Sequence, residues 1–311
     1  MKLIRTYSRE IGVAATIALL NLVLLINARG YFSRENFADL FLANAPVLVI
    51  SLGMLLVILA GRIDISVGSV FAVCSVIAGV AAKQGLSGLE SGLAACLAGA
   101  ACGAINGGLA AYLRVPAIVA TLATMIVLRD GLRWLTQGSW VGDLPPGFQL
   151  LGLTPGKFTA TVVGLVLVLL LLTAAGLRYL HAGRAILATG SSEDAAGMVG
   201  IKTKRVVFFV FTLTGVLTGL AAAINAVRFH QVPSNAGLGM EMKVIAAVVV
   251  GGAAITGGSG TVLGTLLGVI LLGSIGTGLT FLGISAYWEK SVQGAIILIA
   301  VAISLARLDR D

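Results

Sequence analysis

One acidic side chain stands in an otherwise apolar part of the sequence. Asp64 belongs to the stretch GRIDISVGS at 61–69, which separates two long apolar runs. A charged carboxylate is costly inside a bilayer, so Asp64 is expected to face a cavity, a partner or the membrane interface. Alternatively, the stretch forms a cytoplasmic turn in which Asp64 caps the following helix. Both interpretations are compatible, and they make Asp64 and Ser66 candidates for a transport pathway.

Other polar residues lie inside apolar segments and could also line a pathway for a solute. The candidates are Asn106, Thr121 and Asn225. Each could instead form a hydrogen bond with a neighbouring helix, as polar residues in membrane bundles commonly do. The sequence leaves both roles open.

A second segment whose residues could carry function is the basic loop GRAILATGSSEDAAGMVGIKTKR at 183–205. Ser191 or Ser192 can cap a short helix that has Glu193 and Asp194 in its first turn. Such an amphipathic helix would lie across the membrane normal, either on the lipid surface or in a groove on a cytoplasmic partner. Its small residues favour the partner, because helices at the lipid surface usually carry larger apolar anchors.

Charged residues also gather in two segments that we expect on the outer side of the membrane, 129–156 and 228–243. Trp134 and Trp140 within the first segment are typical of the membrane interface. The charges could be solvated helix ends, or they could dock an extracytoplasmic protein through complementary charge. The docking candidates are Arg133, Arg228, Glu241 and Lys243.

The residues needed for catalysis or cofactor binding form no familiar pattern. The pair Gly156-Lys157 lacks the upstream glycine and the following Ser or Thr of a P-loop. His181 and His230 are expected on opposite sides of the membrane, and the three cysteines fit no metal spacing. We therefore expect no metal site, no cofactor bound by this chain and no enzymatic activity. Movement of a solute is the expected function.

Composition indicates the environment that must position these residues. Of the 311 residues, 58% are hydrophobic and 11% are charged, whereas soluble domains carry about 25% charged residues. So few charges cannot cover a water-facing surface, so the chain is expected to contact membrane lipid. The net charge of +8 indicates basic cytoplasmic loops rather than a nucleic-acid partner, because no basic run is interleaved with aromatic residues.

The apolar runs predict an all-α integral membrane protein with about ten transmembrane helices in a single permease domain, residues 1–311. The runs are continuously apolar and lack the alternation of a membrane barrel. Glycines spaced by four residues predict helix faces that pack closely. These glycines are Gly99, Gly103 and Gly107, Gly215 and Gly219, and Gly260, Gly264 and Gly268. The approximate spans are 11–28, 40–60, 66–83, 88–111, 117–137, 157–178, 205–227, 243–258, 260–282 and 287–305.

The distribution of basic residues predicts the orientation in the membrane. The segment 178–205 is the richest internal basic loop and is expected in the cytoplasm. Six spans before this loop and four after it place the N- and C-termini in the cytoplasm as well.

Several motifs taken together resemble one known family. They are RIDISVGS at 62–69, VPAIVATL at 115–122, GRAILATG at 183–190, AAGMVGI at 195–201, GMEMKVIAAVVVGGAAITGGSGTVLGT at 239–265 and ISAYW at 284–288. The sequence resembles the permease subunits of bacterial sugar-type ABC importers, the ribose, galactose, rhamnose and autoinducer-2 group. This resemblance covers nearly the whole chain.

The resemblance implies an assembly in the bacterial inner membrane. The permease would pair with a second copy or a paralogue, and two cytoplasmic ABC ATPase subunits would bind ATP and Mg. A periplasmic sugar-binding protein would deliver a monosaccharide or a related small polyol, of the rhamnose, ribose or autoinducer-2 type. The resemblance also implies a cytoplasmic coupling helix that enters the ATPase, formed by Glu193, Asp194, Ala195, Ala196, Gly197, Gly200 and Ile201.

Two other classes of protein fit the residues. A self-contained secondary transporter would need a buried ion-coupling site, for which Asp64 is the strong candidate. A membrane channel or scaffold would need no energy coupling. An ATPase partner distinguishes the permease subunit from both.

Overall fold

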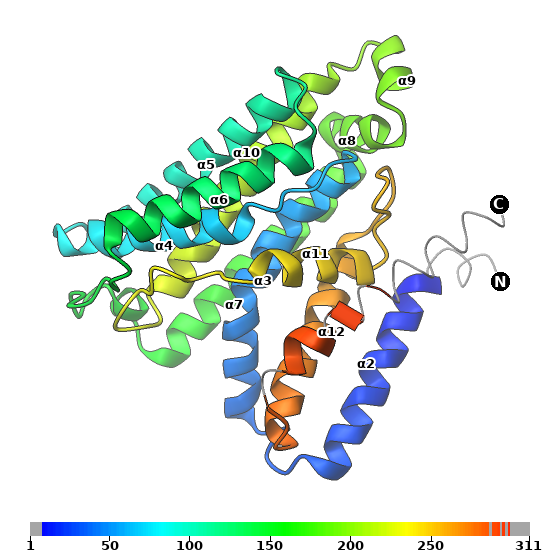
Figure 1. Ribbon diagram of the computed structural model, residues 1–311. Helices are drawn as coiled ribbons and strands as arrows, with labels where there is room; N and C mark the ends of the chain where they lie inside the picture. The colour runs from blue at the N-terminus through cyan, green and yellow to red at the C-terminus, as the bar shows by residue number, and fades with distance from the viewer. Residues whose placement is uncertain (1–7, 286–287, 293, 296–297, 299–311) are drawn as a thin grey trace.

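The computed structural model describes residues 8–285, 288–292, 294–295 and 298, and within these ranges the regular elements are helices. The predicted span 287–305 lies largely outside the described residues. The bundle is shown in Figure 1. Its helices are α2 (Ser8–Asn27), α3 (Arg34–Leu59), α4 (Val67–Lys83), α5 (Gly88–Ala111), α6 (Ala117–Thr136), the 3-10 turn η1 (Gln149–Gly152), α7 (Pro155–Tyr179), α8 (His181–Ser191), α9 (Glu193–Met198), α10 (Thr203–Ala226), α11 (Met240–Val250) and α12 (Val262–Phe281).

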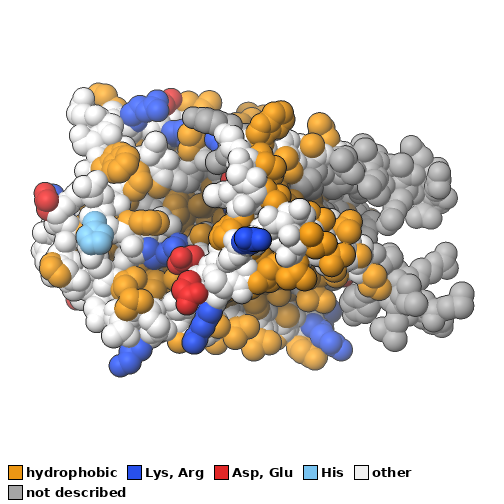
Figure 2. Space-filling model, turned by 90° about the horizontal axis from the view of Figure 1, so that it is seen from below, with side chains coloured by type: hydrophobic (Ala, Val, Ile, Leu, Met, Phe, Trp, Pro, Cys, Tyr) orange, Lys and Arg blue, Asp and Glu red, His pale blue; other side chains and the backbone are white. Residues whose placement is uncertain are grey.

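Six of these helices are long and apolar enough to cross a membrane: α2, α3, α5, α7, α10 and α12. Helix α4 is apolar but shorter, with 17 residues. Large apolar side chains are exposed on the surface, including Ile26, Leu97 and Leu171, and Figure 2 shows hydrophobic side chains over much of one face. A water-soluble monomer rarely exposes apolar patches of this extent. The described part of the chain is thus an all-helical membrane protein.

Helix α3 forms the centre of the bundle. Its residues from Ala45 to Leu59 are all buried, and it contacts α7, α10, α11 and α12. Figure 1 shows α4, α5, α6 and α10 on one side of α3, whereas α2 and α12 lie on its other side. The 61–66 loop that contains Asp64 follows directly after α3, so this central helix positions it.

The predicted close packing at glycines is confirmed. A Cβ atom added to Gly99 of α5 would overlap the carbonyl oxygen of Gly215 in α10, and one added to Gly215 would overlap the carbonyl oxygen of Gly99. Gly264 of α12 meets the carbonyl oxygen of Gly251 in the same way. Small residues at these positions allow the two backbones to approach one another.

The helix expected over 243–258 is shorter in the structure. Helix α11 has 11 residues and ends at Val250, which at about 1.5 Å per residue is roughly half the thickness of the hydrocarbon core. Beyond it, Gly252, Gly257 and Gly258 adopt positive φ angles, which side-chain-bearing residues rarely adopt. The glycines that follow Val250 therefore interrupt the helix that the apolar residues of 243–258 predict.

The glycine contact between α5 and α10 gives a stability prediction. Gly215→Ala places a methyl group against the backbone of α5, and we expect it to destabilise the protein by about 1–3 kcal/mol, as overpacked cores do. Thermal unfolding of the purified protein in detergent measures this change.

The matched control is Gly108→Ala, because a Cβ atom at this α5 position meets nothing within 4 Å. The control should be as stable as the unaltered protein. Equal melting temperatures for the two variants would contradict the close-contact explanation.

Candidate functional site

The loop between α3 and α4 buries its carboxylate. Asp64 is 3% exposed, and its Oδ1 accepts hydrogen bonds from the backbone N–H of Ser66 at 2.8 Å and from the Ser66 hydroxyl at 2.6 Å. Ser66 is the N-cap residue of α4, so Asp64 stabilises the start of this helix. Asp64 is therefore not the N-cap residue but holds the turn that precedes α4, while its burial leaves a pathway role open.

A chain of side-chain hydrogen bonds extends from Asp64 to two further helices. Asn106 of α5 donates from Nδ2 to the Ser66 hydroxyl at 2.8 Å, and the Thr124 hydroxyl of α6 donates to Asn106 Oδ1 at 2.6 Å. The carboxylate of Asp64 is the acceptor at the end of this chain. We call Asp64, Ser66, Asn106 and Thr124 the polar chain.

Thr121 also belongs to this region. Its Oγ1 accepts the backbone N–H of Ile65 at 3.2 Å and donates to the carbonyl oxygen of Ala117 at 2.9 Å. Four of the five predicted pathway residues therefore lie together, namely Asp64, Ser66, Asn106 and Thr121. The fifth, Asn225, lies in the last turn of α10 and is not part of the polar chain.

The short helix expected after Ser191 or Ser192 is present as α9. Ser192 is its N-cap and accepts the backbone N–H of Ala195 at 3.3 Å. Ala196 is the buried residue of this helix, whereas Met198 and Val199 are 83% and 77% exposed. Figure 1 places α9 beside α8 at one end of the molecule. Its exposed apolar side chains are available for a partner.

A groove of about 830 Å³ runs beside α9. Its lining combines the acidic residues Glu193 and Asp194 with the basic residues Arg62, Arg114 and Lys204. Within this groove, Arg62 Nη2 lies 2.6 Å from Glu193 Oε2. This ion pair joins α9 to the loop that contains Asp64. Sequence reasoning missed it, because no local signal connects residues 131 positions apart.

The docking candidates differ in how far they are available to a partner. Arg133 is exposed, and its side chain lies 4.0 Å from Asp130. Arg228 donates to the carbonyl oxygen of Leu42 at 2.7 Å.

Glu241 and Lys243 are already paired within the bundle. Glu241 is 6% exposed and lies 3.4 Å from Arg129 of α6, while Lys243 lies 3.6 Å from Glu289. Glu241 also packs against Gly68, so that a Cβ atom there would overlap its carboxylate. Since Glu241 is buried at its ion pair, it is not presented to a docking protein in this conformation.

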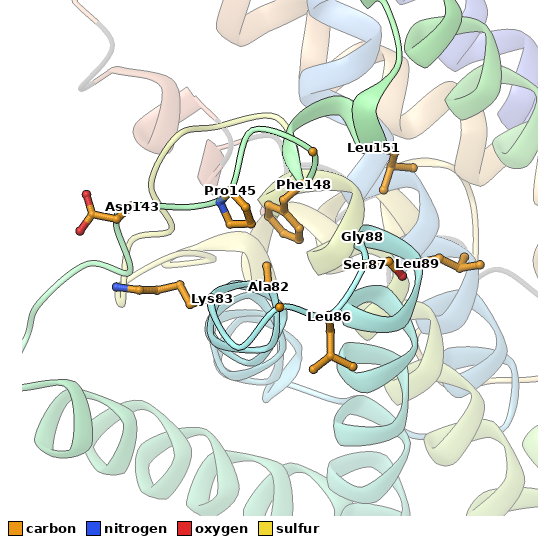
Figure 3. Close-up of a pocket in the computed structure, with 12 residues that line it drawn as sticks. Ala82, Lys83, Leu86, Ser87, Gly88, Leu89, Asp143, Pro145, Phe148 and Leu151 are labelled. Atoms are coloured by element: carbon orange, nitrogen blue, oxygen red, sulfur yellow. The ribbon is translucent and has the colours of Figure 1, made fainter.

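A second cavity, of about 670 Å³, lies at the opposite end of α4 from Asp64. Figure 3 shows Pro145, Phe148 and Leu151 from one loop facing the turn from Ala82 to Leu89. The same loop is joined to the 228–239 segment by paired backbone hydrogen bonds of 2.9 Å between Val141 and Val232. The two segments expected on the outer side thus form one continuous surface.

No group of three or more His, Cys, Asp or Glu residues that could hold a metal ion occurs in the described part of the chain. His181 begins α8 and His230 follows α10, at separate ends of the bundle. Cys74, Cys96 and Cys102 are free thiols in α4 and α5.

Comparisons with known proteins identify the family to which the chain belongs. The chain matches the family described as "Branched-chain amino acid transport system / permease component" over residues 36–301. It is 37% identical over 287 residues to "Autoinducer 2 import system permease protein LsrC" of Yersinia pseudotuberculosis serotype IB (strain PB1/+), covering 91% of this chain and 82% of that protein. The protein of the same name from Yersinia pestis (strain Pestoides F) shows the same identity and coverage.

An all-helical bundle in which six described helices are long and apolar enough to cross a membrane is the architecture of an integral membrane protein. The chain belongs to the family of permease components that these comparisons define. Membership of this family favours a subunit of a multi-component transport system over a secondary transporter that acts alone.

The polar chain generates a prediction about folding. Asp64→Leu leaves the N–H and hydroxyl of Ser66 without their acceptor, and we expect a loss of about 1–3 kcal/mol in stability, the cost of unpaired buried groups. Asp64→Asn retains an acceptor oxygen and should keep most of the stability. Thermal unfolding in detergent compares the two variants.

Asp130→Leu is the control for these measurements, since Asp130 has a largely exposed side chain. Its melting temperature should stay close to that of the unaltered protein. If Asp64→Leu is as stable as this control, the polar chain does not support the α3–α4 loop.

Proposed function

We propose that this permease component serves an ATP-driven importer of a small polyhydroxylated solute, such as autoinducer-2 or a monosaccharide. The observation that carries the proposal is 37% identity over 91% of the chain to permeases of autoinducer-2 import. The family description names branched-chain amino acids, so the substrate class is supported by the individual relatives rather than by the family.

ATP hydrolysis is assigned to a separate cytoplasmic ABC ATPase, which would bind ATP and Mg. Helix α9 and the turn after it are proposed as the coupling contact with this subunit. Two features support this assignment: α9 lies at one end of the bundle, and its tip exposes Met198 and Val199. A second permease copy or a paralogue, together with a periplasmic sugar-binding protein, would complete the importer.

The proposed mechanism is alternating access. Closure of the ATPase subunits on ATP would displace α9, and the displacement would move the helices that surround the pathway. In the bacterial inner membrane, α9 and both termini would lie on the cytoplasmic side, as the distribution of basic residues predicts. The surface formed by the 139–152 loop and the 228–239 segment would then face the periplasm and meet the binding protein.

The substrate class is tested by ATP hydrolysis of the reconstituted importer. The binding protein loaded with autoinducer-2, rhamnose or ribose should stimulate hydrolysis, whereas the same protein mixed with leucine should not. Stimulation depends on a ligand that the binding protein closes around, so it reports the transported class. Stimulation by leucine alone would overturn the sugar-type assignment.

The coupling contact is tested by a bulky substitution on α9. Gly197→Trp should abolish co-purification of the ATPase without destabilising the fold, because a Cβ atom at Gly197 meets nothing within 4 Å. A tryptophan at this position would prevent α9 from entering the proposed groove on the ATPase. Co-purification from detergent extracts is the measurement.

Gly156→Trp in α7 is the matched control, since a Cβ atom at Gly156 also has nothing within 4 Å. The control should retain the ATPase. If Gly197→Trp retains the ATPase as well, α9 is not the contact.

A further inference from the structure

Helix α9 has few contacts that could transmit a force into the membrane. It contacts α8 and α10, which are its neighbours in sequence, and its N-cap bond to Ser192 is local. Among the described residues, its ion pair with Arg62 is the side-chain bond that reaches a distant part of the chain. Arg62 therefore gives α9 a side-chain link to the end of α3 that is separate from its contacts with α8 and α10.

Arg62 is held firmly at its own end of this link. Its backbone N–H donates to the carbonyl oxygen of Val57 at 3.0 Å, which fixes it to the last turn of α3. Two residues later, Asp64 begins the polar chain that connects the loop to α5 and α6. Arg62 thus lies two residues from the carboxylate at which the polar chain begins.

The corner from which α9 emerges is fixed to the same place by backbone contacts. A Cβ atom at Gly190, near the end of α8, would overlap the carbonyl oxygen of Leu59 and lie 2.8 Å from the backbone nitrogen of Gly258. The N–H of Gly258 itself donates to the carbonyl oxygen of Leu59 at 3.0 Å. The corner can therefore act as a pivot against the end of α3, with Glu193 just beyond it.

We propose that the Arg62–Glu193 ion pair couples α9 to the polar chain, and that Arg62 is a positioning residue for this transmission. The proposal rests on the proposed function, in which the ATPase acts on α9. The ion pair is partly exposed, with side chains 33% and 43% accessible. A pair in such a position contributes little to stability, so its expected role is to fix geometry rather than to hold the fold.

The test uses a double-mutant cycle in the complete importer, reconstituted in vesicles with its ATPase and binding protein. The variants are Arg62→Gln, Glu193→Gln and the double variant, with Arg62→Lys as the conservative replacement. Autoinducer-2 is the transported probe, and the measured quantity is uptake per ATP hydrolysed.

We expect Arg62→Gln to reduce uptake per ATP by about two- to thirtyfold, the range of substitutions that alter coupling between sites. The ATPase should still co-purify, so the loss is one of coupling and not of assembly. Arg62→Lys should restore most of the uptake per ATP. The double variant should resemble either single variant, because each single substitution already removes the same ion pair.

Lys204→Ala is the matched control, since it removes one charge from the same groove but leaves the ion pair intact. It should transport with the same uptake per ATP as the unaltered importer. A normal ratio for Arg62→Gln, or additive losses in the double variant, would overturn the inference.

A measurement on the permease alone keeps this test separate from the proposed function. Hydrogen–deuterium exchange of residues 193–198 should be faster in Arg62→Gln than in Lys204→Ala, because α9 loses its link to the loop. Equal exchange in both variants would overturn the inference. By contrast, failure of the unaltered permease to retain any ATPase would contradict the proposed function and not this link.

Discussion

Backbone contact at glycine is the interaction on which this bundle depends, because apolar side chains gain little by leaving lipid for a protein interior. Gly99 meets Gly215 where α5 crosses α10, and Gly251 meets Gly264 where α11 approaches α12. The same kind of contact at Gly190 fixes the corner before α9. These contacts set the spacing between α5 and α10, between α11 and α12, and between the end of α8 and the end of α3.

Local signals in the sequence were sufficient for the fold class and for several details. Continuous apolar runs predicted a helical membrane protein. Glycines at spacings of four residues predicted closely packed faces, and the structure shows that two of these faces, on α5 and α10, meet each other. The serine and acidic residues before Ala195 predicted α9, although Ser192 alone caps it. Asp64, Ser66, Asn106 and Thr121 were predicted individually as polar residues in apolar surroundings, and the structure places them together.

Features that depend on distant parts of the chain could not be predicted in this way. Hydropathy counts Gly251 and Gly252 as part of an apolar run, yet these residues end α11 and shorten the expected helix. Charge alone suggested that Glu241 is a docking residue, whereas its pairing with Arg129 and its burial follow from the approach of α6, α4 and α11. Pairing across such distances is decided by packing, which no local pattern encodes.

The ion pair between the partly exposed Arg129 and the buried Glu241 has a consequence for how this sequence can change over time. Removal of Arg129 would leave a carboxylate that is 6% exposed without its counter-ion, and an uncompensated buried charge is strongly unfavourable. Replacement of both residues by apolar ones of similar volume is far better tolerated. Divergence at these two positions should therefore proceed by paired substitutions, so that they are inherited as a unit even though 112 positions separate them.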